Sequence, residues 1–108
     1  NLRTYVRYGD RPGVYFFCLD ASDALSVEMA RRFYHLPYLN ADMALEMQSN
    51  PLNKVEALCL HYKSKRRDSR GQPAQFEAVY WPSGPMFQSQ PGSLTHWLTE
   101  RYCLYTSN

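Results

Sequence analysis

Aromatic and β-branched residues dominate the start of the chain and predict two strands. Residues 2–8 (LRTYVRY) have this composition, and residues 14–20 (VYFFCLD) form an unbroken apolar run that is short enough for a strand buried on both faces. Between them, GDRPG combines glycine and proline, which favour a turn. The first part of the chain therefore predicts two strands that are joined by a turn.

The apolar residues change to a helical period over residues 21–36 (ASDALSVEMARRFYHL). Ser22 or Asp23 can cap the start of this helix, because both side chains accept hydrogen bonds from free backbone N–H groups. Pro37 ends the helix, since the residue before a proline is disfavoured in helical conformation. Spacings of three or four residues predict one buried helix face, which consists of Leu25, Met29, Phe33 and Leu36.

Strict alternation of apolar and polar residues follows in residues 38–48 (YLNADMALEMQ) and is typical of a half-buried strand. Residues 55–67 and 74–81 predict two more strands after the turns SNPLNK and DSRGQP, so this half of the chain is expected to be an antiparallel meander. In residues 38–48 the pattern places Leu39, Ala41, Met43, Leu45 and Met47 on one face, and Asn40, Asp42, Glu46 and Gln48 on the other.

The last quarter of the chain predicts an irregular loop, a short helix and a last strand. Three prolines and two glycines in residues 82–92 favour the loop, Ser93 can cap a helix over residues 94–102, and residues 103–107 predict the strand. The helix is expected to turn Leu94, Trp97 and Leu98 inward. Together these elements predict one domain over residues 1–108, of the α+β class, with two helices on a mainly antiparallel sheet.

Composition predicts a folded chain and gives no sign of a nucleic-acid or membrane partner. Hydrophobic residues make up 44% and aromatic residues 15%, which is enough to build a core. The formal net charge of +2 is too small to imply a polyanionic partner. No apolar run reaches the roughly 18 residues that a membrane-spanning helix requires.

Cysteine and histidine residues are too scattered to predict a metal site. Cys18, Cys59 and Cys103 form no Cys-x-x-Cys pair, and the three histidines do not have zinc-ligand spacing. Three distant cysteines instead favour reduced and mostly buried thiols, which is typical of a cytoplasmic protein. The sequence therefore predicts no metal and no cofactor.

A short basic segment, HYKSKRRDSR, can be interpreted in two ways. It holds five cationic residues and could bind nucleic acid or phosphate. Side chains in a strand divide between two faces, however, and beyond Tyr62 no aromatic residue is interleaved for stacking on bases. The pattern favours a solvated strand end and turn. The cationic residues are Lys63, Lys65, Arg66, Arg67 and Arg70.

Several segments, in order along nearly the whole chain, resemble a family of YqjF-like bacterial domains of unknown function. These segments are NLRTYVRYGDRPGVYFFCLDA, ARRFYHLPYLNA, SKRRD, FEAVYWPSGP and GSLTHWLTERYCLYT, of which the last is the most specific. The resemblance implies an acetoacetate decarboxylase-like fold, in which a curved, barrel-like sheet surrounds a cavity. It also implies that this chain corresponds to the middle and later part of the family domain. In SKRRD it suggests a structural arginine, paired with an acid such as Glu77 or Glu100.

The same resemblance argues against decarboxylase activity. Acetoacetate decarboxylases have a similar helix followed by two lysines, one of which forms a Schiff base while its neighbour lowers its pKa. Here HLPYLN places Tyr38 and Leu39 at the two lysine positions. A phenol cannot form an imine, and a leucine has no reactive group. Near the first strand, where the decarboxylases carry an acid, this chain offers Arg3.

Five residues are candidates for the polar groups or walls of such a cavity. Arg3 and Arg7 flank Tyr5 on one face of the first strand, and an arginine that points inward would bind a carboxylate through two hydrogen bonds. The alternative is a solvated strand face, which is favoured for Arg7. The candidates are Arg3, Tyr5, Tyr38, Glu100 and Arg101, with Phe16 as a further wall residue.

Each remaining candidate also has a purely structural interpretation. Tyr38 could donate a hydrogen bond to a ligand, or it could be an aromatic residue that fills space at the start of a strand. Glu100 and Arg101 could close one end of a cavity, or they could form the end of a helix that packs on the sheet, with Arg101 near the negative end of the helix dipole. The sequence leaves these alternatives open.

These residues together favour a domain that binds a small organic acid without the Schiff-base lysine. Two alternatives are a lyase or hydrolase that acts on a keto acid through Tyr38 or Glu100, and an oligomeric interaction module without a ligand. Because a barrel without its opening strands exposes unpaired edges and apolar surface, we expect a second copy of the chain to cover them in a homodimer or larger homo-oligomer.

Overall fold

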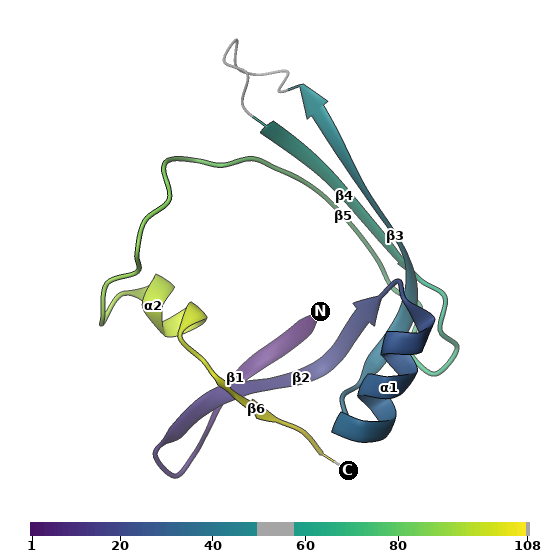
Figure 1. Ribbon diagram of the computed structural model, residues 1–108, viewed down its shortest axis with the longest axis horizontal. Helices are drawn as coiled ribbons and strands as arrows, with labels where there is room; N and C mark the ends of the chain where they lie inside the picture. Colours follow the sequence, from purple (N-terminus) through teal and green to yellow (C-terminus); the bar gives the residue numbers. More distant parts are fainter. Residues whose placement is uncertain (50–57, 108) are drawn as a thin grey trace.

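The structure is a computed structural model that describes residues 1–49 and 58–107. Within these residues it contains six strands and two helices, which form a curled half-barrel of the predicted α+β class (Figure 1). The elements are β1 (Leu2–Tyr8), β2 (Arg11–Ala21), α1 (Ala24–Tyr34), β3 (Tyr38–Ser49), β4 (Leu58–Arg66), β5 (Gln75–Tyr80), α2 (Leu94–Thr99) and β6 (Cys103–Tyr105).

The sheet is mostly, but not purely, antiparallel. Its strand order is β1-β2-β3-β4-β5, and β6 pairs with β2. The pairs β1/β2, β3/β4 and β4/β5 are antiparallel, whereas β2/β3 and β2/β6 are parallel. The predicted meander is therefore confirmed for β3, β4 and β5. The β2/β3 pair is parallel because α1 lies between the two strands and carries the chain back along the sheet, so that β3 runs in the same direction as β2.

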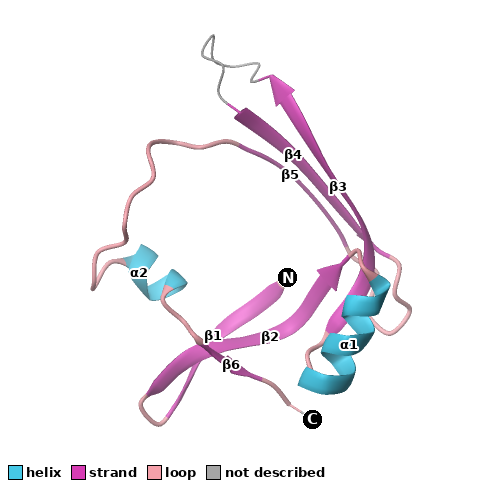
Figure 2. Ribbon diagram, viewed as in Figure 1, coloured by secondary structure: helices cyan, strands magenta, loops and turns pink. Residues whose placement is uncertain are grey.

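The curled sheet has two distinct faces, which we call the inner face and the outer face. In Figure 2, α1 lies outside the curve of the strands, so the face on its side is the outer face. Strand register places Arg3 opposite Phe16 and Tyr5 opposite Val14, so these four side chains share one face of the β1/β2 pair. In the same way Tyr38 pairs with Leu19, so both belong to the outer face, while the next residue, Leu39, points inward.

Helix α1 begins and ends as its sequence predicts. The carboxylate of Asp23 accepts a hydrogen bond from the backbone N–H of Ser26 at 2.8 Å, so Asp23 and not Ser22 is the cap. His35 follows the last turn in the left-handed conformation, with φ 53°, and its N–H binds the carbonyl of Ala30. Pro37 then leads directly into β3.

The predicted buried face of α1 is wrong. The helix buries Val27 completely, whereas Leu25, Met29 and Phe33 are exposed. Val27 lies two residues from Leu25, about 200° around the helix, so it belongs to the opposite side. The apolar stripe therefore points away from the sheet, and no described residue covers it.

Two other predictions of burial also fail. Residues 14–20 are not buried on both faces, because Phe17 is exposed at a register shift where β1 passes from Leu2 to Arg3. Helix α2 is shorter than predicted, and its Leu94 and Trp97 remain exposed. The hydrophobic core among the described residues is consequently small and consists of Val14, Leu19, Val27, Leu39, Ala41 and Cys59.

Two glycines permit close approaches that hold the sheet together. A Cβ added at Gly13 would lie 2.4 Å from the carbonyl oxygen of Cys103, so only glycine lets β6 pair with β2 at this point. A Cβ added at Gly71 would lie 2.5 Å from Cδ1 of Leu39, so glycine also lets the turn after β4 pack against the start of β3.

Candidate functional site

Three of the candidate residues meet where β1 approaches α2. The rings of Tyr5 and Trp97 lie 4.6 Å apart between centroids, with their planes tilted by 48°. The guanidinium carbon of Arg101 stands 4.3 Å from the centre of the Trp97 ring and 5.9 Å from that of Tyr5. Arg3 lies 5.5 Å from the centre of the Tyr5 ring and donates a hydrogen bond to the Tyr5 hydroxyl at 3.2 Å. The sequence predicted Arg3, Tyr5 and Arg101 but assigned Trp97 only to helix packing.

The local structure of α2 fixes the position of Arg101. The Ser93 hydroxyl accepts a hydrogen bond from the N–H of His96 at 3.2 Å and so caps the helix. At the other end, Nε of Arg101 donates to the carbonyl of Trp97 at 2.8 Å. This bond satisfies one of the carbonyls that the last helical turn leaves free, and a cation is favoured there by the helix dipole. The guanidinium is thus folded back over the Trp97 ring.

The arginines of this region differ in how far their charge is neutralised. Arg7 forms an ion pair with Asp10 at 3.4 Å. Neither Arg3 nor Arg101 forms an ion pair with any carboxylate in the described part of the chain. The Tyr5 hydroxyl accepts from Arg3 and therefore keeps its own proton to donate. The region thus offers two uncompensated cations and one O–H donor to an incoming anion.

An open groove of about 470 Å³ runs past Tyr5, Arg7 and Arg101, while Arg3 lies outside its lining. A second groove of about 250 Å³ adjoins it, because both are lined by Pro12, Trp97 and Arg101. The first groove is completed by Tyr5, Val6, Arg7 and Asp10, and the second by Gly92, Ser93, His96 and Glu100. We refer to the pair of grooves as the arginine–aromatic groove.

The other two candidates occupy different positions. Glu100 lines the smaller groove, and its carboxylate accepts a hydrogen bond from the hydroxyl of Tyr102, which raises the pKa of that tyrosine. Tyr38 lines neither of the two grooves, and its carbonyl accepts a hydrogen bond from Arg31 of α1 at 2.7 Å. The structure therefore does not bring Tyr38 together with the arginine–aromatic groove.

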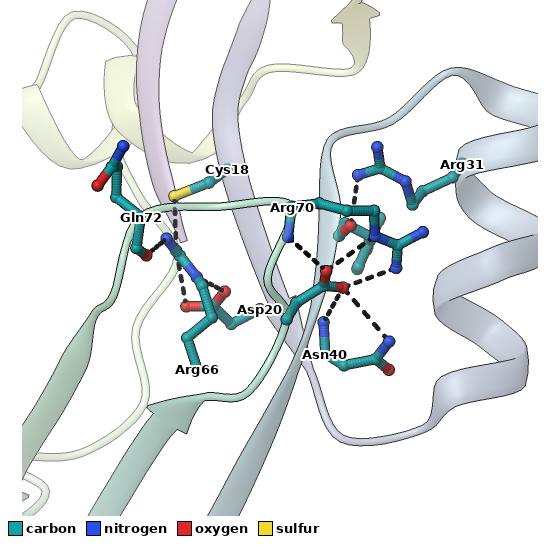
Figure 3. A network of polar contacts seen from close by, with 9 residues as sticks. Cys18, Asp20, Arg31, Asn40, Arg66, Arg70 and Gln72 are labelled. Carbon is teal, nitrogen blue, oxygen red and sulfur yellow. Dashed lines mark hydrogen bonds and ion pairs between the residues drawn. The ribbon is translucent and has the colours of Figure 1, made fainter.

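A nearly buried ion pair that the sequence did not predict crosses the inner face (Figure 3). Arg66 donates from Nε and Nη2 to the two carboxylate oxygens of Asp20 at 2.8 and 3.1 Å, and from Nη1 to the carbonyl of Gln72 at 2.7 Å. The side chains are only 7% and 18% exposed. The hydrogen bond to Asp20 raises the pKa of Arg66 further. Arg66 is thus the structural arginine that the resemblance implied, but its partner is Asp20 and not Glu77 or Glu100.

A second polar cluster joins the turn after β4 to β3 and α1. Asp68 accepts hydrogen bonds from the backbone N–H of Asn40 at 3.0 Å and from Nε of Arg70 at 2.8 Å, as Figure 3 shows. Arg70 also forms an ion pair with Glu28 of α1 at 2.6 Å. The hydrogen bonds from Arg70, and then the one from Asn40, hold the pKa of Asp68 well below its usual range. Charged residues of the basic segment therefore tie secondary structure together.

The lysines of the basic segment lie on the outer face. Nζ of Lys63 is 3.8 Å from a carboxylate oxygen of Glu77, and Lys65 is opposite Asp42. Their orientation keeps both amines away from the inner face. In the described part of the chain, no group of three or more histidine, cysteine, aspartate and glutamate residues is arranged to hold a metal ion. Neither of the described helices has the length and apolar run needed to span a membrane.

Comparison with known proteins places the whole chain in one family. The model of DUF2071, described as an uncharacterized conserved protein, matches residues 1–108. The chain belongs to this family. Uncharacterized protein YqjF of Bacillus subtilis (strain 168) is 46% identical over 107 residues, which are 99% of this chain and 40% of the relative. No solved structure matches the chain. The predicted YqjF-like resemblance is therefore confirmed, and the chain spans about 40% of the length of this relative.

Proposed function

We propose that the chain binds a small organic carboxylate in the arginine–aromatic groove. The observation that carries this proposal is the convergence of Arg3 and Arg101 on the ring of Tyr5, with neither guanidinium compensated by a carboxylate in the described residues. Two uncompensated cations beside one ring repel each other, and an anion bound between them removes that repulsion. Arg101 therefore supplies the groove with a cation that no carboxylate of the described residues pairs with, and Tyr5 and Trp97 supply aromatic walls for the carbon skeleton of an acid.

The chemistry of recognition follows from the free donors. Nε of Arg101 is engaged by the carbonyl of Trp97, so its terminal nitrogens remain to bind a carboxylate. The Tyr5 hydroxyl donates to the same group. Hydrogen bonds to charged groups contribute about 1.5–3 kcal/mol each. Two or three such bonds in an open groove correspond to a dissociation constant on the order of 1 mM for a small acid.

The fold proposed for this function is part of an acetoacetate decarboxylase-like barrel from which the reactive amine has been lost. The curled sheet and the passage from α1 through HLPYLN into β3 support this assignment. At the two lysine positions, Tyr38 faces outward, and Leu39 is buried on the inner face. Incubation with acetoacetate and borohydride should therefore leave the mass of the chain unchanged. A stable adduct would disprove this assignment.

Intrinsic fluorescence can test the carboxylate proposal directly. A Trp81→Phe background leaves Trp97 as the single tryptophan, because the chain contains two. Titration with benzoate should change the Trp97 emission until it saturates, whereas benzamide, which has the same shape without the charge, should not. Substitution Arg101→Gln should weaken benzoate binding at least 10-fold.

Arg7→Gln provides the matched control. Arg7 lines the same groove, but its charge is already paired with Asp10, so this variant should bind benzoate within about 2-fold of the unsubstituted chain. Equal binding of benzoate and benzamide would show that charge is not recognised. Equal loss in the two arginine variants would show that only the overall positive charge matters, and either result would contradict the proposed site.

A further inference from the structure

In the middle of strands β3, β4 and β5, before Arg66, the charged side chains all lie on one face of the sheet. Within residues 42–47, 59–65 and 75–80, strand register places every charged side chain on the outer face. Apart from Ser64 and two tyrosine hydroxyls, the inner face of this segment carries no polar side chain. We call it the apolar inner face, and it consists of Met43, Leu45, Met47, Leu60, Tyr62, Ser64, Phe76, Ala78 and Tyr80.

This apolar inner face is largely open to water. Leu45 is 59% exposed, Met47 75% and Phe76 60%. A groove of about 490 Å³ is lined by Met43, Ser64 and Phe76 of this face together with their strand neighbours Asp42, Ala44, Lys63, Lys65, Gln75 and Glu77. In antiparallel sheets with this alternation, the apolar face normally packs on a core. The sequence pattern is therefore that of a buried face, while the described residues leave it uncovered.

The accessible surface and the radius of gyration of the chain are both larger than those of a compact monomer of the same size. Its accessible surface is 8844 Å², whereas a folded monomer of 12.6 kDa has about 6,200 Å². The difference of about 2,600 Å² exceeds the roughly 800 Å² that each partner buries in a standard interface. The radius of gyration is 17.0 Å, whereas about 13 Å is typical of a domain of this length. Both quantities exceed those of a compact monomer of this length, so a further polypeptide is expected to cover part of this surface.

We infer that the partner is a second copy of this chain, packed with its own apolar inner face against the first. A two-fold contact brings each residue of the face near a copy of the same surface, so any charge there would meet a like charge. The absence of charged side chains from this face removes that penalty. The two concave faces then face each other and enclose a shared apolar core, to which Leu45 and Phe76 of both copies contribute.

Sedimentation equilibrium of the 108-residue chain tests this inference, with inner-face variants and a matched outer-face control. The wild-type chain should sediment at twice its mass of 12.6 kDa. Leu45→Glu and Phe76→Glu place a charge on the apolar inner face and should weaken dimerisation at least 100-fold. Val79→Glu introduces the same charge on the outer face, where Val79 is opposite His61 and does not line the groove, and should leave dimerisation unchanged.

The concentration dependence of thermal unfolding provides a second readout that needs no variant. Because only the folded chain dimerises, the wild-type Tm should rise with protein concentration. A wild-type chain that stays monomeric at 100 µM, or a dimer that survives both inner-face substitutions, would overturn the inference. A monomer whose mass increases only when a polypeptide with the unmatched part of YqjF is added would overturn it in favour of that partner.

Discussion

Arg66 and Asp20, which are 46 residues apart in the chain, form a two-pronged ion pair that ties β4 to β2 across the intervening strand β3. The pair lies on the inner face and is almost completely removed from water. It receives additional support from the carbonyl of Gln72 and from Sγ of Cys18, which is 3.3 Å from Nη2 of Arg66. This contact joins the β1/β2 hairpin to the β3–β5 meander.

Removing one partner of this pair should strongly destabilise the fold. Arg66→Gln leaves the Asp20 carboxylate without its counter-ion in a poorly hydrated place, so we expect the free energy of unfolding to fall by about 3 kcal/mol. Arg67→Gln is the matched control, because Arg67 pairs with Asp42 at an exposed position and should cost less than about 1 kcal/mol. Urea denaturation measures both. Similar losses in the two variants would refute the assigned role of Arg66.

The stability of the chain should depend on the protonation of Asp68. Its pKa is held below the ordinary value by Arg70 and Asn40, so the ionised carboxylate stabilises the folded state above the unfolded pKa of about 4. This contribution should shrink as the pH falls below about 4 and approaches the folded pKa. Urea denaturation between pH 7 and pH 2.5 should show this decline, and Asp68→Asn should flatten it. Glu28, whose pKa is lowered by Arg70, should account for part of the remaining slope. An unchanged slope in Asp68→Asn would contradict this role.

Substitution Gly13→Ala should separate β6 from β2. The added Cβ would fall within 2.9 Å of both the carbonyl oxygen and the Cβ of Cys103, so the strands must move apart. Overpacking of this kind costs about 1–3 kcal/mol, and the amides of β6 should exchange with solvent faster. Gly84→Ala is the control, since its added Cβ meets nothing within 4 Å. Normal amide protection in β6 of Gly13→Ala would disprove the close approach.

Asp23→Ala should weaken the first turn of α1, whereas Ser22→Ala should not. Only the Asp23 carboxylate accepts from the N–H of Ser26, and hydrogen bonds with the side chain and then the backbone of Ser26 lower the pKa of Asp23. Loss of the cap leaves an unpaired donor at the start of the helix. Amide exchange of residues 24–28 should therefore accelerate in Asp23→Ala alone. Equal acceleration in both variants would show that the cap is shared.

Local patterns in the sequence predicted most elements of this fold. Alternation in β3 even distinguished the side on which Leu39 lies from the side on which Tyr38 lies. The two parallel strand pairs were not predictable, because they join segments that are distant in sequence and depend on where α1 returns the chain.

Periodicity also could not decide which side of α1 is buried. It correctly identified an apolar stripe through Leu25, Met29 and Phe33, but the helix packs on the sheet through Val27. Likewise, the sequence showed arginines and acids in abundance without showing which would meet. Asp20 follows an apolar strand and carries no local sign that it will pair with Arg66, since that contact depends on the curl of the complete sheet.

Helix α2 has only six residues, which is too short to persist by itself in water. Its conformation depends on the Trp97 ring resting on Tyr5 and on Arg101 bonding back to the last turn. A molecule that binds between Tyr5, Trp97 and Arg101 would stabilise the helical conformation of α2, and unfolding of α2 would weaken binding of that molecule. Ligand binding in the arginine–aromatic groove and folding of α2 are thereby linked. Protection of the amides of residues 94–99 from exchange would therefore increase with the fraction of chains that have ligand bound.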